Sequence, residues 1–198
     1  MDLRIVPANE ASWDDVQTVF GQRGDAAACQ CQRYKHTDGW LGHMPREELA
    51  GRLFEQTGCG DPGVGRTTGL VAYLGDEPVG WCAVEPRPAY GRLLRMPIPW
   101  KDRPGEDKAD ESVWAVTCFV VRAGYRRRGI SYALAEAAVD YARERGARAL
   151  EAYPMITTPE KVVTWGELHV GSRNVFRAAG FTQLTHPTLR RVVMRLDL

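Results

Sequence analysis

The sequence lacks a long apolar run and lacks an excess of charge of either sign. No stretch of its 198 residues approaches the roughly 18–20 consecutive apolar positions of a membrane-spanning helix. The opening residues MDLRIVPANE do not resemble a signal peptide. The 26 lysines and arginines are balanced by 25 acidic residues, for a formal net charge of +1. These absences argue against a membrane protein and a general nucleic-acid binder, and they predict a cytoplasmic location.

Cysteines are few, and their spacing fits no disulfide framework. The five cysteines are an odd number, and in a cytoplasmic chain we expect reduced thiols. Cys29, Cys31 and Cys59 could supply three zinc thiolates, with His36 and His43 nearby, but no fourth ligand stands at a typical spacing. We therefore expect no metal, and zinc is the weaker alternative.

Two nucleotide-binding motifs are also missing. The chain has neither the Gly-x-Gly-x-x-Gly fingerprint of dinucleotide-binding folds nor a phosphate loop ending in Gly-Lys-Ser/Thr. Its composition, 44% hydrophobic and 26% charged, is that of an ordinary globular protein. This length and composition predict a single domain over residues 1–198.

What the chain does contain is an ordered series of strand-like and helix-like segments. Periodicity and turn residues predict strands at 3–7, 69–75, 78–85, 113–121, 149–154, 181–186 and 190–198. They predict helices at 12–20, 45–57, 130–145 and 172–180. The segment 23–40 is expected to be a loop with at most a helical turn, and Asp76-Glu77 a tight hairpin turn. Residues 86–110, with five prolines, form a long connection of the kind that is often functional.

The stretch GYRRRGIS, residues 124–131, stands between the apolar run of 113–121 and the helix that follows. The first turn of a helix has unpaired backbone N–H groups, and a glycine there lets a phosphate approach the backbone. Three consecutive arginines add charge-assisted hydrogen-bond donors. The stretch therefore predicts a pyrophosphate site, and the alternative is a solvated basic turn with an ordinary helix cap.

Two motifs carry a family resemblance. FVVRAGYRRRGISYALAEAAVDYA resembles the acetyl-CoA motif of the GNAT acetyltransferase superfamily, whose core is Arg/Gln-x-x-Gly-x-Gly/Ala, with Arg126, Gly129 and Ser131 at the matching positions. Downstream, VFRAAGF resembles the family's Leu-Tyr-x-x-x-Gly-Phe signature. The resemblance implies an α/β (α+β) fold: a GNAT-like mixed, mostly antiparallel central sheet of six to seven strands flanked by about four helices. It also implies acetyl-CoA as co-substrate.

The resemblance also assigns roles along the first motif. It implies that the pantetheine arm and thioester align on one strand segment, where a backbone N–H would stabilise the oxyanion, and that the pyrophosphate binds the turn that follows. The residues so implied are Phe119, Val120, Val121, Arg126, Arg127, Arg128, Gly129, Ile130 and Ser131. The chain departs from the family twice. Ser131 replaces a usual Gly or Ala, and could contact phosphate or cap the helix. Phe176 replaces a tyrosine that, in many members, protonates the leaving thiolate.

Transfer to an amine needs a group that removes the amine's proton. One common family position for that base corresponds to Ala115, which has no acidic group. The remaining candidates are Glu151 and Tyr153, which share one face of a strand, Glu85 at a strand end, and His169, whose usual pKa suits a base near neutral pH. For each of them, a solvated or structurally hydrogen-bonded side chain is the alternative.

The acceptor is expected to be a small-molecule or peptide amine, and the sequence does not choose between them. We expect its pocket between the first two helices, the 86–110 connection and the loop after the fifth strand, with aromatic candidates Trp40, Trp81, Tyr90, Trp100 and Trp165. Trp81 and Trp114 fit core packing better. Phe176 and Ala115 favour a rival function, a CoA-binding sensor with little or no catalysis. Dimerisation is common in the family, and nothing in the sequence identifies an interface.

Overall fold

A single seven-stranded sheet runs through the computed structural model, which describes residues 2–37, 41–158 and 163–198. The strand order is β1-β2-β3-β4-β5-β7-β6, and only the β4–β5 pair is parallel. The mixed, mostly antiparallel sheet of six to seven strands is thereby confirmed. Its strands are β1 (Leu3–Pro7), β2 (Gly69–Leu74), β3 (Glu77–Pro86), β4 (Val113–Val121), β5 (Ala149–Ala152), β6 (Thr182–Thr188) and β7 (Arg191–Asp197).

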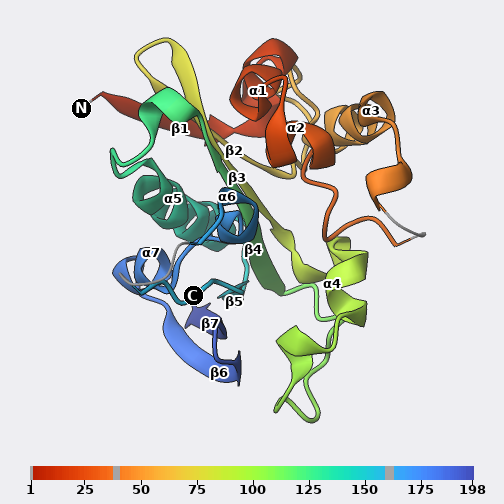
Figure 1. Cartoon of the computed structure of the whole chain (residues 1–198), viewed down its shortest axis with the longest axis vertical. Coiled ribbons are helices and arrows are strands. Elements are labelled where there is room, and N and C mark those ends of the chain that lie inside the picture. The colour runs from red at the N-terminus through yellow and green to blue at the C-terminus, as the bar shows by residue number, and fades with distance from the viewer. Residues whose placement is uncertain (1, 38–40, 159–162) are drawn as a thin grey trace.

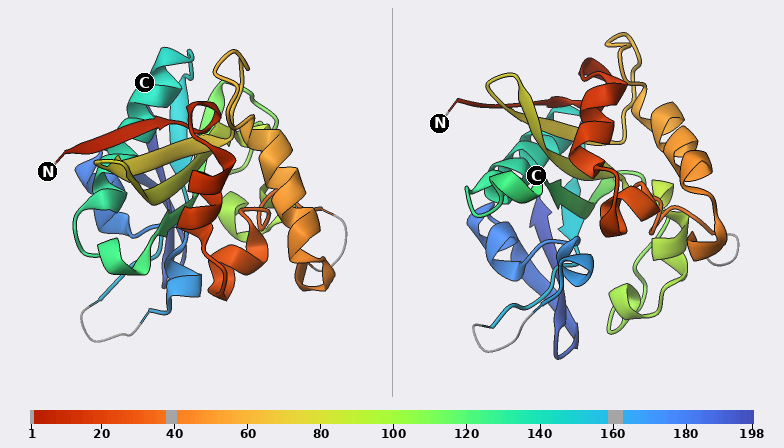
Figure 2. Two further views of the ribbon diagram at one scale, coloured as in Figure 1. Left: turned by 90° about the horizontal axis from the view of Figure 1, so that it is seen from above. Right: turned by 45° about the horizontal axis from the view of Figure 1, so that its top comes forward.

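Helices cover both faces of the sheet, as Figures 1 and 2 show. On one face lie α5 (Ile130–Glu144) and α7 (Arg173–Ala178), and on the other α1 (Trp13–Phe20), α2 (Gly24–Cys29), α3 (Arg46–Thr57) and α4 (Gly91–Arg95). The short α6 (Trp165–Leu168) precedes α7. The four expected helices are α1, α3, α5 and α7. The others have only four to six residues and lie in segments expected to be irregular.

A β-bulge in β4 decides which of its side chains face which helices. Ala83 of β3 pairs with Cys118, but the next residue, Val84, pairs with Val116, so Thr117 is an extra residue in β4. The bulge puts Val116 and Phe119 together in the core beneath α5, whereas Cys118 packs in the core beneath α1. Bulges of this kind re-aim side chains and are common beside active sites.

The sheet opens where β4 and β5 separate. The two strands pair only over Val113–Val116 and Ala149–Ala152. Beyond that point the chain between α6 and α7 lies between them: the Phe119 N–H donates to the His169 carbonyl at 2.6 Å, and the Met155 N–H donates to the Gly171 carbonyl at 3.0 Å. One edge of β4 therefore contacts this connecting segment instead of a neighbouring strand.

The turn between β2 and β3 differs slightly from the one expected. The β2–β3 turn is Gly75-Asp76, one residue earlier than expected, because Gly75 has the left-handed φ of +59° that a tight turn requires. In the described part of the chain, no helix combines the length and the apolar character needed to cross a membrane.

Candidate active site

A cavity of about 320 Å³ opens on the α5 face of the sheet, and we call it the α5-side cavity. One wall is the outer half of β4 with the turn that follows it, and the other is the segment from α6 to α7. Most of the residues implied by the first motif line it. They are Phe119, Val121, Arg126, Arg127, Gly129, Ile130 and Ser131.

The turn before α5 leaves the start of that helix open. Gly129 is the N-cap, with a φ of +79°, and no side chain caps the helix. The first helical bonds are those of Tyr132 and Ala133 to the Gly129 carbonyl, so the N–H groups of Ile130 and Ser131 have no partner within the helix. Arg127 also has a left-handed φ, +61°. Successive N–H groups in such a turn, at a positive helix end, form a concave anion site.

Two of the implied residues lie elsewhere. Val120 points to the opposite face, where it packs in the core beneath α1, because successive side chains of a strand alternate. Arg128 does not line the cavity, and its guanidinium lies 5.4 Å from the ring centroid of Tyr125. Ser131 stands inside the first turn of α5, so it does not act as the N-cap.

Phe176 is fully buried. Its ring packs edge-on against Phe181, with centroids 5.1 Å apart, and at 5.7 Å against Phe119. The residue is therefore part of the core beneath α5, and it offers no proton donor to the cavity.

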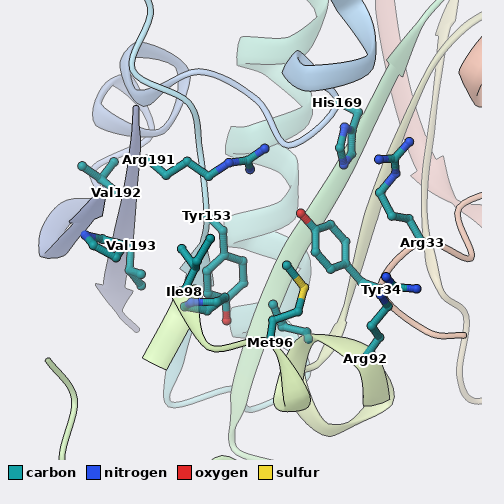
Figure 3. Close-up of a pocket in the computed structure, with 13 residues that line it drawn as sticks. Arg33, Tyr34, Arg92, Met96, Ile98, Tyr153, His169, Arg191, Val192 and Val193 are labelled. Atoms are coloured by element: carbon teal, nitrogen blue, oxygen red, sulfur yellow. The ribbon is translucent and has the colours of Figure 1, made fainter. Parts of the chain in front are cut away.

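A second cavity, of about 260 Å³, lies on the other face of the sheet, and we call it the α4-side cavity. Figure 3 shows its polar side chains: Arg33 and Tyr34 from the chain after α2, Arg92 from α4, and Arg191 from the start of β7. Its apolar wall is made by Leu93, Met96, Ile98, Val192 and Val193. Of the elements expected to hold the acceptor, the 86–110 connection and the chain after β5 line this cavity, whereas the described residues of α1 and α3 do not. The segment between α2 and α3 and the β6–β7 hairpin line it instead.

His169 lies between the two cavities. Its imidazole lines the α4-side cavity, whereas the side chain of the preceding residue, Leu168, lines the α5-side cavity. The Nδ1 atom lies 2.7 Å from the Gly166 carbonyl, which can only accept, so Nδ1 carries the proton. Nε2 is buried and has no hydrogen-bond partner in the described chain. Burial lowers the pKa of His169 to about 4, and Arg33 and Arg191 also favour the neutral ring.

Glu151 is buried in a cluster of guanidinium groups. One carboxylate oxygen lies 2.5 Å from Arg103 and 3.2 Å from Arg87, and the other accepts from Arg103 at 3.2 Å and from the Tyr153 hydroxyl at 2.9 Å. Burial, with the Glu151 carboxylate, raises the pKa of Tyr153 well above its usual value. Tyr153 lines the α4-side cavity, but its proton is directed to Glu151.

Glu85 lies apart from both cavities. Its carboxylate pairs with the Lys35 ammonium at 2.5 Å and accepts a hydrogen bond from the Thr68 hydroxyl. The structure therefore brings His169 and Tyr153 to one cavity, places Glu151 behind Tyr153, and leaves Glu85 outside.

The three expected aromatic residues whose side chains the structure describes do not line the acceptor pocket. Trp81 and Tyr90 are fully buried in the core, and Trp100 is buried beneath Arg87 and Arg103, with its indole N–H bonded to the Leu93 carbonyl. Trp40 and the side chain of Trp165 lie outside the described residues. Tyr34 also lines the cavity, and this aromatic residue was not predicted from the sequence. It stands next to Arg33 in a segment without periodicity, so only the tertiary structure identifies it.

The zinc alternative has no support in the described residues, which contain no group of three or more His, Cys, Asp or Glu side chains placed to hold a metal ion. Cys31 instead accepts a hydrogen bond from the Trp81 indole at 3.3 Å, and Cys59 lies beside Thr57.

Several solved structures with a similar architecture are N-acetyltransferases. Similar structures include a GCN5-related N-acetyltransferase from Kribbella flavida (18% identity, 99% of this chain and 98% of that chain covered, TM-score 0.54). A ribosomal-protein-alanine N-acetyltransferase from Brucella melitensis is 18% identical, with both chains fully covered and a TM-score of 0.55. The GNAT domain of S. lividans PAT is 21% identical, with 99% of this chain and 90% of that chain covered and a TM-score of 0.53. At these identities the likeness shows the fold.

The family follows from the sequence itself. The model of the acetyltransferase (GNAT) family matches residues 32–159, more than half of the chain. The protein therefore belongs to the acetyltransferase (GNAT) family, in which acetyl transfer from acetyl-CoA is the general activity. A search of curated proteins found no match.

Proposed function

We propose that this acetyltransferase binds acetyl-CoA in the α5-side cavity and passes the acetyl group directly to an amine held in the α4-side cavity. The observation that carries the proposal is the position of His169. The segment Leu168–Gly171 forms the partition between the two cavities. The His169 imidazole lines the acceptor side of it, and its buried Nε2 has no hydrogen-bond partner in the described chain.

The cofactor would lie along β4 and end at the turn before α5. There the free N–H groups of Ile130 and Ser131, with the Arg126 and Arg127 side chains, suit a pyrophosphate. The pantetheine arm would follow the edge of β4 at Phe119 and Val121. The Phe119 N–H now donates to the His169 carbonyl, so the arm, or an oxyanion that uses this donor, would have to replace that bond.

In the transfer step the amine nitrogen would attack the thioester carbonyl carbon, the carbon–sulfur bond would break, and CoA would leave as a thiolate. The amine's proton would pass to Nε2 of His169, which is unprotonated at neutral pH and has no competing partner in the described chain. Glu151 and Glu85 are less suited to this role, because both carboxylates are held by cationic side chains.

The test is CoA thiol release from acetyl-CoA in the presence of a panel of amines. His169→Asn keeps a side-chain donor but removes the proton acceptor, and should lower kcat by about 10²–10⁴-fold with little change in acetyl-CoA affinity. His186→Asn, at an exposed histidine of β6 outside both cavities, is the matched control. Unchanged kcat in His169→Asn would rule out the assigned base.

A CoA-binding sensor is the second candidate. It is favoured by the buried phenyl ring of Phe176 and by Ala115, a fully buried residue without an acidic group. This function predicts tight acetyl-CoA binding with no thiol release above hydrolysis for any amine in the panel.

A further inference from the structure

Three arginines line the α4-side cavity, and among the described residues no acidic side chain lines it. They come from separate parts of the chain: Arg33 after α2, Arg92 in α4 and Arg191 at the start of β7. In Figure 3, Arg33 and Arg191 approach His169 and the Tyr34 hydroxyl from opposite sides, and Arg92 lies below Tyr34. The fold thus gathers positive charge around the cavity that the His169 imidazole lines.

Arg33 is exposed, Arg92 and Arg191 are half-buried, and all three differ from the arginines around Glu151. Arg87, Arg103 and Arg195 surround Glu151 and Glu106, so acidic partners offset their charges. In the described chain, none of the cavity arginines forms an ion pair with a carboxylate.

Asp25 is an exposed acidic residue near Arg33 and His169. It lines a small adjoining cavity with Arg33 and His169, and does not line the α4-side cavity. Arg191 and Arg92 are half-buried, and withdrawing such charges from water without a counterion is unfavourable.

An acceptor with only a protonated amine would meet three like charges in this cavity. A carboxylate or phosphate on the same molecule would pair with the guanidinium groups, for which such planar donors are well suited. The same positive field favours the neutral form of the amine, which is the form that attacks the thioester.

We infer that the acceptor is a small amine that also carries an oxyanion, a carboxylate or a phosphate, bound by Arg33, Arg92 and Arg191. The inference rests on the proposed function and specifies its acceptor. A volume of about 260 Å³ suits a molecule of amino-acid size, and the wall of Met96, Ile98 and Val192 suits an apolar part of it. Polyamines, aminoglycosides and other polycations do not match this cavity.

The first experiment compares acceptors that differ only in the anion. Thiol release is measured with phenylalanine against phenylalaninamide and phenethylamine, with O-phosphoethanolamine against ethanolamine, and with spermidine. We expect kcat/KM to be roughly tenfold or more higher for one anionic amine than for its neutral analogue, because a site built to bind a polar group rejects analogues that lack it. The two pairs distinguish a carboxylate from a phosphate.

The second experiment tests the arginines. Arg191→Gln and Arg92→Gln should raise KM for the preferred anionic acceptor by about tenfold or more, change kcat less, and remove the preference over the neutral analogue. Arg95→Gln is the matched control, because this exposed arginine lies in the same helix as Arg92 and outside the cavity.

The outcomes separate the two proposals. Turnover that favours neutral or cationic amines, or a preference for anionic amines that persists in both arginine variants, would overturn the inference and leave the proposed function standing. Absence of thiol release with every amine, despite acetyl-CoA binding, would overturn both.

Discussion

At the scale of single residues, Gly129 has two properties that the turn before α5 needs. Its φ of +79° is in the left-handed region, where a side chain is strained. A Cβ added at this glycine would meet no atom within 4 Å, so the space above the start of α5 is open. A side chain there would occupy the approach to the free N–H groups of the first turn.

Asparagine tolerates this backbone conformation better than other side chains, so Gly129→Asn separates binding from folding. We expect CoA affinity, measured by calorimetry, to fall by about tenfold or more, while the free energy of unfolding changes by only about 1 kcal/mol. Gly146→Asn is the control, since Gly146 has a φ of +75°, has equally open surroundings, and lies beyond the other end of α5. Equal CoA affinity in both variants would show that the pyrophosphate does not bind at this turn.

At the scale of elements, the cluster around Glu151 joins three parts of the chain. Glu151 belongs to β5, Arg195 to β7, and Arg87 and Arg103 to the connection between β3 and β4. Both arginines of the connection and Glu151 are almost fully buried. The cluster therefore fastens a proline-rich connection to the sheet, and α4 and the cavity wall of Met96 and Ile98 belong to that connection.

Glu151→Ala should lower the free energy of unfolding by about 3–5 kcal/mol, because it removes the fully buried carboxylate of the cluster and leaves the buried Arg87 and Arg103 with only the partly exposed Glu106 as acidic partner. Urea denaturation measures the change, with the exposed Glu136→Gln of α5 as control. Substitution of a general base would lower kcat without lowering the free energy of unfolding. If Glu151→Ala lost kcat but kept the stability of the parent protein, the catalytic assignment predicted from the sequence would stand.

The elements also show which features of the structure can be predicted from sequence patterns. Periodicity and turn residues predicted all seven strands, because these are local properties of the chain. For the same reason the arginine-glycine turn predicted five lining residues of the α5-side cavity, namely Arg126, Arg127, Gly129, Ile130 and Ser131. The α4-side cavity depends on long-range packing, so Tyr34, Arg92 and Arg191 had no local signal. The prediction that Trp100 lines the acceptor pocket was wrong for the same reason. An aromatic residue in a long connection suggested a binding pocket, whereas buried arginines cover its ring.

At the scale of the whole molecule, a net charge of +1 conceals two different environments for arginine. Around Glu151 the charges are paired, whereas in the α4-side cavity they face a neutral histidine. The single continuous sheet supports one domain over residues 1–198, which stays a prediction, as does dimerisation.

Stability should depend on pH through His169. Its pKa is about 4 in the folded protein and about 6.5 in the unfolded chain, so between these values the unfolded state binds a proton that the folded state does not. This group's contribution is therefore fully present above pH 6.5 and decreases as the pH falls, by about 3 kcal/mol in total near pH 4. Denaturation of the parent and of His169→Asn between pH 7 and 4 should show a smaller decline in the variant. Parallel declines would contradict the assigned protonation state.

The hydrogen bond from Phe119 to the His169 carbonyl couples ligand binding in the two cavities. Any ligand that accepts a hydrogen bond from the Phe119 N–H must displace His169, whose imidazole lines the α4-side cavity. Ligand binding in the α5-side cavity is therefore coupled to the shape of the α4-side cavity. Such coupling is reciprocal for binding. We expect desulfo-CoA to change the affinity for an acceptor, and the acceptor to change the affinity for desulfo-CoA by the same factor. Independent affinities would mean that the connecting segment accommodates the cofactor without moving His169.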